Sequence, residues 1–201
     1  MRFFSKYTWR FSRDLKKIYL TFDDGPTPEI TQFVLDELKK YNAKATFFCI
    51  GKNIQTHPDI FKKITTSKHT IGNHTANHLN GWATKSKNYI EDFLECEHII
   101  SKSLGKVTQP KLFRPPYGKI KKSQAKRILK KGYKIIMWDV LSVDFDNATS
   151  KESCLNNVLN NTENGSIVVF HDSVKASEKL KFVLPKFLQE FSEKGFIFKA
   201  I

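Results

Sequence analysis

The sequence predicts an α/β fold, a distorted (β/α) barrel of about seven parallel strands. One observation is that short apolar runs, typical of buried strands, alternate with helical patterns along the whole chain. Another is that unusual polar clusters directly follow several of these strands. Polar groups from many separate strands converge more naturally at the mouth of a barrel than along the single crevice of an open sheet. An open doubly wound sheet is the alternative architecture.

The first half of the chain carries three of the expected strands. A strand over residues 18–22 precedes a helix over residues 28–41, in which Thr27 is a candidate N-cap and apolar residues recur at helical spacing. Residues 45–50 form the second strand and residues 58–65 a short helix. A third, brief strand at 70–71 is followed by a longer helix over 87–104, which Gly105 ends.

The second half continues the alternation without a linker-like stretch. Strands are expected at residues 112–114, 133–138, 166–170 and 196–198, with helices at 123–131, 151–160 and 177–194. A chain of 201 residues with 40% hydrophobic residues suits one domain with a full core. We therefore expect a single catalytic domain over residues 1–201, with residues 1–16 as a basic N-terminal extension.

Charge and cysteine content limit the classes of partner. The net charge of +14 comes mainly from scattered lysines, which indicates a solvated surface, so no nucleic-acid partner is expected. Attraction to an anionic polymer is the alternative. Cys49, Cys96 and Cys154 form no Cys-x-x-Cys pair and are predicted to be buried thiols.

The N-terminus shows no apolar stretch long enough for a signal peptide or a membrane span. We therefore expect no transmembrane segment and an intracellular protein. Contact of the basic N-terminal segment with a membrane surface, or a nonstandard export route, is the alternative. The sequence does not indicate an oligomeric state.

Two adjacent carboxylates stand at the end of the first strand. Asp23 and Asp24 lead directly into the turn Gly25-Pro26. One carboxylate could hold a metal ion while its neighbour, aimed differently, works as a base. The alternative is an ordinary acidic turn, because Asp-Gly and Gly-Pro are common turn dipeptides.

Two histidines follow the third strand at a spacing of four residues. On one helical turn, His74 and His78 would place both rings on the same face, ready for one ion. Two imidazoles and one carboxylate make a three-ligand site that suits catalytic Zn²⁺, although Co²⁺, Ni²⁺ or Fe²⁺ could bind it too. Spacing alone does not choose between Asp23 and Asp24 as the third ligand.

Four motifs together carry a family resemblance. They are Thr-Phe-Asp-Asp-Gly-Pro (21–26), His-Thr-Ala-Asn-His (74–78), Arg-Pro-Pro-Tyr (114–117) and Val-Phe-His (169–171). In this order they are similar to the successive motifs of the polysaccharide deacetylase family, the NodB-homology domains of carbohydrate esterase family 4. The resemblance implies a distorted (β/α) barrel and metal-dependent removal of acetyl groups from N-acetylated sugars of an oligosaccharide or polysaccharide.

The resemblance also implies roles for individual residues. Asp23 matches the base, and Asp24 matches the metal ligand beside His74 and His78. His171 matches the acid that protonates the leaving nitrogen. Further matches are Arg114, which holds the base; Asp144, which tunes the acid; and Pro116 and Tyr117, which contact substrate near a backbone N–H for the oxyanion.

Two positions depart from the family pattern. Members usually have Asp-Trp after the fifth strand, whereas Phe145 follows Asp144 here, so a smaller ring without the indole donor replaces a wall of the site. Val169 replaces a leucine of the pocket for the acetyl methyl group. Both changes bear on substrate shape more than on chemistry. Asp139 and Asp172 are expected to be structural.

Three other functions compete with glycan N-deacetylation. An O-acetyl esterase acting on xylan would use the same apparatus. A glycan-binding protein that kept the fold without catalysis predicts loss of a ligand or base, and none is missing. An iron oxygenase with two histidines and one carboxylate usually has a β jelly roll, which the alternation of strands and helices contradicts. The expected partner is an acetylated glycan, with peptidoglycan, chitin oligomers and lipid-linked sugars all compatible.

Overall fold

The computed structural model describes residues 6–105 and 107–201. The first elements in chain order are β1 (Tyr7–Thr8), β2 (Lys17–Asp23), α1 (Ile30–Lys40), β3 (Thr46–Cys49), α2 (Gly51–Thr56), α3 (Pro58–Thr66), β4 (Thr70–Asn73) and α4 (Ser86–Leu104). They are followed by β5 (Leu112–Phe113), the 3-10 helix η1 (Pro116–Gly118), α5 (Lys122–Lys130), β6 (Lys134–Ile136), β7 (Val140–Leu141), α6 (Lys151–Asn161), β8 (Ile167–His171), η2 (Val174–Ala176), α7 (Ser177–Glu193) and β9 (Ile197–Lys199).

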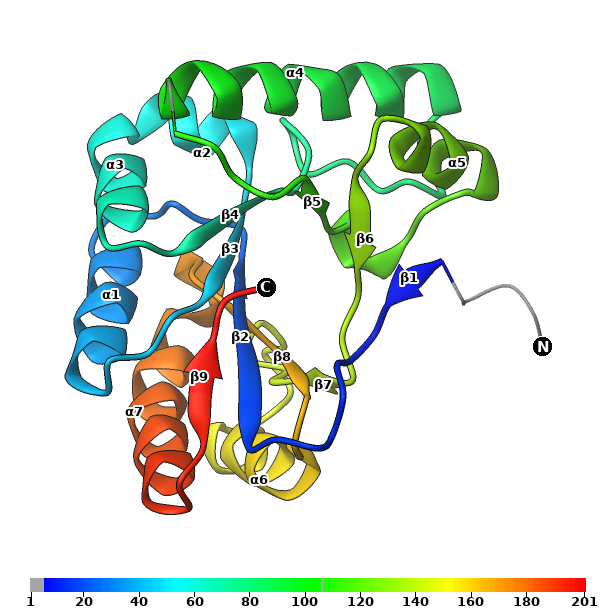
Figure 1. Ribbon diagram of the computed structural model, residues 1–201. Coiled ribbons are helices and arrows are strands. Elements are labelled where there is room, and N and C mark those ends of the chain that lie inside the picture. Colours follow the sequence, from blue (N-terminus) through cyan, green and yellow to red (C-terminus); the bar gives the residue numbers. More distant parts are fainter. Residues whose placement is uncertain (1–5, 106) are drawn as a thin grey trace.

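The strands form one parallel sheet that curls into an open half-barrel. Its order is β1-β6-β5-β4-β3-β2-β8-β7, and β9 pairs with the amino-terminal part of β2. The helices lie on the outside of the curled sheet (Figure 1). The predicted distorted β/α barrel is therefore confirmed. All seven predicted strands are present, and β1 and β7, each of two residues, are added to them.

Three details differ from the sequence-based expectation. The helix α2 was not predicted. Helix α1 begins at Ile30 rather than Pro28, and its N-cap is Glu29, without a side-chain cap, so Thr27 does not cap it. Strand β1 lies inside the predicted N-terminal extension and pairs with β6, so part of residues 1–16 belongs to the sheet. Residues 1–5 lie outside the described part.

Alternation along the strands decides which side chains enter the barrel. On β2, Leu20 and Phe22 pack in the main core beneath the helices, so Thr21 and Asp23 face the inside. On β5, Phe113 packs under the helices α4 and α5, so Leu112 before it and Arg114 after it point inward. The same rule directs Val169 and His171 of β8 inward, because Phe170 belongs to the outer core.

Asp139, which follows β6 in the chain, contacts the start of β8. The Asp139 carboxylate accepts hydrogen bonds from the backbone N–H of Ile167, at 2.8 Å, and from the Ser166 hydroxyl, at 3.1 Å. The chain between β6 and β7 is thereby tied to the start of β8. This contact supports the structural role predicted for Asp139.

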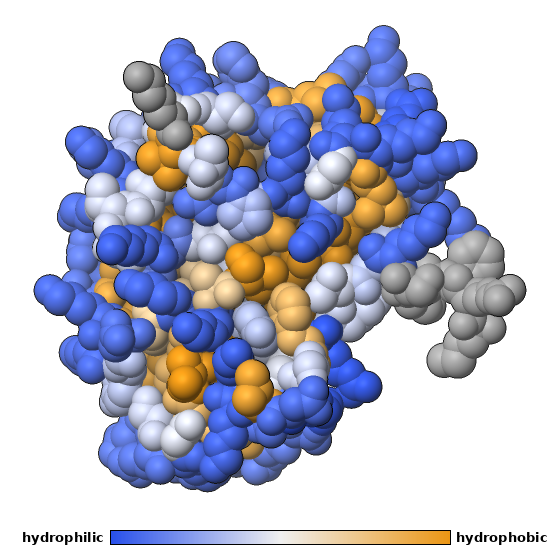
Figure 2. Space-filling model, in the orientation of Figure 1, coloured by the Kyte–Doolittle hydropathy of each residue, from blue (hydrophilic) through white to orange (hydrophobic). Residues whose placement is uncertain are grey.

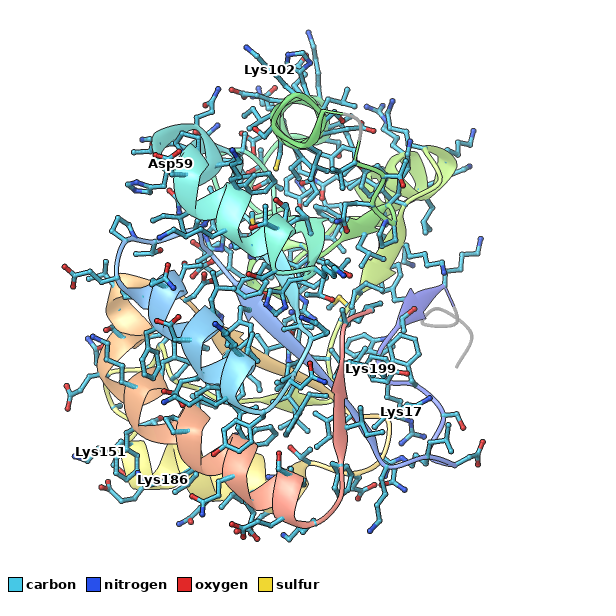
Figure 3. All side chains as sticks on the ribbon, turned by 60° about the vertical axis from the view of Figure 1, so that its left-hand side comes forward. Lys17, Asp59, Lys102, Lys151, Lys186 and Lys199 are labelled. Atoms are coloured by element: carbon cyan, nitrogen blue, oxygen red, sulfur yellow. The ribbon has the colours of Figure 1, made fainter. Side chains whose placement is uncertain are left out.

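The surface is largely hydrophilic at its periphery. On the face shown in Figure 2, apolar residues gather near the middle of the view, where the curled sheet opens. Lys17, Lys102, Lys151, Lys186 and Lys199 come from five different elements and point outward in different directions (Figure 3). The lysines are thus scattered, as predicted. Cys49, Cys96 and Cys154 are buried free thiols, also as predicted. No helix of the described chain is long and apolar enough to cross a bilayer.

Candidate active site

A cavity of about 420 Å³ opens at the carboxyl ends of the strands. Predicted site residues that line it are Asp23, Asp24, His74, His78, Tyr117, Phe145, Val169 and His171. Arg114 and Asp144 are fully buried behind it. Pro116 is not among the lining residues. Its neighbour Pro115 takes that place, because the chain turns into η1 at Pro116.

The segment with the two histidines is a loop and not the helical turn that their spacing suggested. Thr75 and His78 have positive φ angles of 65° and 54°, which no right-handed helix allows. The Asp92 carboxylate of α4 holds the loop by accepting hydrogen bonds from the N–H groups of Ala76, at 3.0 Å, and Asn77, at 3.1 Å. A side chain from another element therefore gives the loop its shape.

Asp24, His74 and His78 converge on one point. The Asp24 Oδ1 atom lies 3.3 Å from His78 Nε2 and 3.7 Å from His74 Nε2, and the ligand atoms of the three residues all lie within 4.8 Å of one another. Asp24 Oδ1 is buried and accepts no hydrogen bond from the described residues. A buried carboxylate oxygen without a donor is costly unless a cation binds it, so this set of two nitrogens and one oxygen fits a divalent metal ion.

The two rings present their Nε2 atoms in the form that a metal ion requires. His74 Nδ1 lies 2.8 Å from the Arg114 carbonyl oxygen. Because a carbonyl only accepts, Nδ1 carries the hydrogen and a neutral ring keeps its Nε2 lone pair toward Asp24. Burial and the neighbouring His74 lower the pKa of His78 to about 4, so His78 is neutral at physiological pH.

Asp23 is held by the buried guanidinium of Arg114. The Arg114 Nη1 group donates to Asp23 Oδ1 and to the Thr21 hydroxyl, both at 2.7 Å, and Nη2 donates to the Met137 carbonyl at 3.0 Å. The guanidinium also stacks on Phe48, 4.2 Å from the ring centroid. Burial alone would raise the pKa of Asp23, but the charge and hydrogen bond of Arg114, with the charges of His74 and His171, together hold the pKa below its usual value. Asp23 is thus a fixed carboxylate.

His171 and Asp144 form a second pair. The Asp144 carboxylate lies 2.7 Å from His171 Nδ1 and accepts the His171 backbone N–H at 2.9 Å. Burial alone would lower the pKa of His171, but the charge and hydrogen bond of Asp144 raise it to about 9. His171 is therefore protonated at neutral pH, and its Nε2–H is left for the cavity. Phe145 packs edge-on against this ring, with centroids 5.0 Å apart.

Asp172 braces the loop that carries the two aspartates. Its Oδ1 accepts the Gly25 N–H at 3.0 Å, and its Oδ2 accepts the Thr31 hydroxyl at 2.5 Å. A Cβ atom on Gly25 would lie 2.0 Å from Oδ2, so only glycine fits there. Burial raises the pKa of Asp172 to about 8, although both hydrogen bonds act against the shift. The expected structural role of Asp172 is thus to fix the turn after Asp24.

Several site side chains are presented by left-handed backbone. Asp24, His78 and Tyr117 have φ angles of 84°, 54° and 59°, and Val143, which precedes Asp144, has a φ of 62°. This region is unfavourable for most residues other than glycine, although asparagine, aspartate and histidine tolerate it better, and it is least favourable for a β-branched residue such as Val143. Such conformations are found mainly where the surrounding structure imposes them, as at binding and catalytic sites.

Sequence reasoning missed other residues of the site. Trp138, Leu141, Lys119 and Lys175 also line the cavity, and Thr21 shares the Arg114 contact described above. A usable signal existed for Thr21, because it lies two residues before Asp23 on the same strand and therefore faces the same side. For Leu141 the signal was hidden by the unpredicted strand β7.

Comparison with known proteins places the chain in a family. A family model for polysaccharide deacetylases matches residues 12–136, more than half of the chain. Two relatives from Bacillus cereus are named peptidoglycan-N-acetylglucosamine deacetylases. One is 39% identical over 170 residues, which cover 84% of this chain and 61% of the relative. The other is 36% identical over 195 residues, which cover 96% and 90%. The chain therefore belongs to the polysaccharide deacetylase family, a family of hydrolases.

Comparison with solved structures supports the same family assignment. A solved peptidoglycan N-acetylglucosamine deacetylase in complex with an N-oxidanyl-benzamide superimposes with a TM-score of 0.91 at 34% sequence identity. The match covers 98% of this chain and 91% of that chain. The curled half-barrel and its helices are therefore those of the family over nearly the whole length.

Proposed function

We propose that the protein is a metal-dependent hydrolase that removes acetyl groups from N-acetylated sugars of an oligosaccharide or polysaccharide, of the N-acetylglucosamine type. The observation that carries the proposal is the meeting of three units in one cavity. They are the cluster of Asp24, His74 and His78, the carboxylate of Asp23 held by Arg114, and the protonated His171. The named activity of the relatives supports the substrate class.

The cation that fits the cluster is Zn²⁺, or another divalent metal such as Co²⁺ or Ni²⁺, because two imidazoles and one carboxylate leave positions open for water and substrate. When bound, such an ion polarises a carbonyl group and lowers the pKa of a coordinated water to about 7. Asp24, His74 and His78 would hold it.

The remaining steps fall to groups of the protein itself. Asp23, kept ionised by Arg114, accepts the proton of the attacking water as general base. A backbone N–H near Tyr117 stabilises the oxyanion. His171, kept cationic by Asp144, donates its Nε2 proton to the departing nitrogen, so that acetate and a free amine leave. Phe145 and Val169 form walls around the acetyl group, and Tyr117 covers His78, with ring centroids 4.6 Å apart.

An acetate-release assay tests the proposed function. The panel contains N-acetylglucosamine oligomers, peptidoglycan and acetylxylan, each with chelator and with added Zn²⁺, Co²⁺ or Ni²⁺. We expect acetate from the N-acetylated glycans, its loss with chelator and its return with metal. Faster release from acetylxylan would assign the site to O-acetyl esters. If no glycan released acetate in the presence of metal, the deacetylase function would be refuted, and a glycan-binding role would remain.

The dependence of the rate on pH should report the pair of His171 and Asp144. His171 acts as an acid only while protonated, so kcat should fall as pH rises through about 9. Asp144→Asn removes the largest of the charges that raise this pKa, while burial continues to lower it. The alkaline limb of the kcat profile should then move to lower pH. We expect a shift of roughly one pH unit or more, which is the usual size of the effect of a neighbouring charge. An unshifted alkaline limb would show that a different group is the acid.

A further inference from the structure

Trp82 is a large apolar side chain on the surface next to the site. It lies between the histidine loop and α4, and 62% of its surface is exposed. Its polar groups are already bonded within the protein. The indole Nε1–H donates to the Ile120 carbonyl at 3.2 Å, and the backbone N–H donates to Asn80 Oδ1 at 3.0 Å. The indole therefore has only its apolar ring surface to offer a ligand.

The position of Trp82 is fixed by two loops that bind each other. Gln124 Nε2 donates to the Gly81 carbonyl at 2.9 Å, and Lys121 Nζ donates to the Thr84 carbonyl at 2.8 Å. Gly81 itself lies so close to the Lys119 carbonyl that a Cβ atom would be 2.3 Å from its oxygen. Trp82 is therefore held against the loop that follows Tyr117, and little conformational freedom is lost when a ligand covers it.

Lys119 connects the cavity that holds Asp24, His74 and His78 with Trp82. Tyr117, with 59% of its surface exposed, lines the cavity and contacts His78. Lys119 also lines the cavity, and its Nζ atom lies 5.6 Å from the centroid of the Trp82 ring system. A chain molecule bound at the cluster and leaving the cavity past Tyr117 would thus meet Lys119 and then Trp82.

We propose that Trp82 and Lys119 form a subsite for a sugar unit that flanks the acetylated one, so that the preferred substrate is a glycan chain and not a single N-acetylated sugar. This inference rests on the proposed deacetylase function. The C–H face of a sugar ring packs on an aromatic ring, and its hydroxyl groups accept hydrogen bonds from an ammonium group. A single exposed apolar residue that lies away from the cavity needs no functional explanation. Leu15 is such a residue, since it precedes β2 at the opposite end of that strand from Asp23.

The experiment measures kcat/KM for acetate release from N-acetylglucosamine oligomers of increasing length. For the wild-type protein kcat/KM should rise with length. Trp82→Ala should lower it by about tenfold on the longest oligomer and leave the shortest cleaved oligomer unchanged. Trp82→Leu keeps apolar bulk for loop packing and should behave as Trp82→Ala does. Trp82→Phe keeps an aromatic face and should recover most of the length dependence, and the matched control Leu15→Ala should retain all of it.

The outcomes separate the subsite from the function. If the metal-loaded wild-type protein releases no acetate at any length, the proposed function fails. If it is active but Trp82→Ala and Trp82→Leu lose the same factor at every length, or nothing, the subsite is refuted while the function stands. Should Trp82→Ala unfold in a thermal melt, Trp82→Leu and Trp82→Phe decide the question by the same comparison.

Discussion

Replacing Asp23 with asparagine is expected to lower the rate of acetate release by about 10³-fold, within the range that general bases contribute. An amide cannot accept the proton of the attacking water. It can still accept the hydrogen bond that Arg114 Nη1 donates at 2.7 Å, so the geometry should persist. Because Asp24, His74 and His78 are untouched, metal content should equal that of the wild-type protein. Paired measurements of kcat and bound metal on the purified variant check both statements.

The Asp23 variant also leaves a buried cation without its counter-charge. Removal of one partner of a buried ion pair costs about 3–5 kcal/mol when nothing replaces it. Thr21 and two backbone carbonyls still accept hydrogen bonds from Arg114, so we expect a lower melting temperature but a folded protein. Asp36→Asn on the surface of α1 is the matched control, with unchanged rate. A near wild-type rate for the Asp23 variant would mean that another group is the base.

Replacing His78 with alanine is expected to abolish both metal retention and turnover. His78 Nε2 is the nitrogen closest to the unpaired Asp24 oxygen, at 3.3 Å. Loss of groups that only orient a ligand typically costs 10–100-fold in metal affinity, so loss of a ligand should cost more than about 100-fold. A competition titration against a chromophoric chelator measures the affinity directly, and the acetate assay measures turnover.

The matched control for this variant is His98→Ala. His98 is an exposed histidine of α4 and has no place in the cavity. It should change neither metal affinity nor rate. If the His78 variant bound Zn²⁺ as tightly as the wild-type protein, the cluster of Asp24, His74 and His78 would not be the metal site, even though its atoms are close together.

Local sequence patterns were sufficient for the fold because its long elements have clear periodicity. The apolar run of β8, residues 167–170, and the amphipathic helix α4 follow from the spacing of their apolar residues. Strands β1 and β7 have two residues each, too few to show any period, and they are strands only because β6 and β8 lie beside them. Elements of this kind are specified by the assembled sheet and not by their own residues.

The candidate site was predictable where strands position it and less so where loops do. Period-two alternation places Asp23 and His171 inside the barrel, so identifying the strand was enough. The His74–His78 loop owes its shape to hydrogen bonds with Asp92, a residue of another element, and no local pattern reports that contact. The same limit explains why Pro115, and not the predicted Pro116, lines the cavity. It also explains why Thr27 was wrongly predicted to cap α1, since Thr31 and Asp172 organise that turn instead.

The left-handed residues of the site have a consequence for attempts to make the protein more heat-resistant. Each non-glycine residue held in this region costs on the order of 1–3 kcal/mol. Glycine at Asp24, His78, Tyr117 or Val143 would relieve this strain. At Val143 glycine would loosen the turn before Asp144, and at the other three positions it would remove a side chain of the cavity. Stabilising changes are better sought on the outer helices, where robustness and catalysis do not compete.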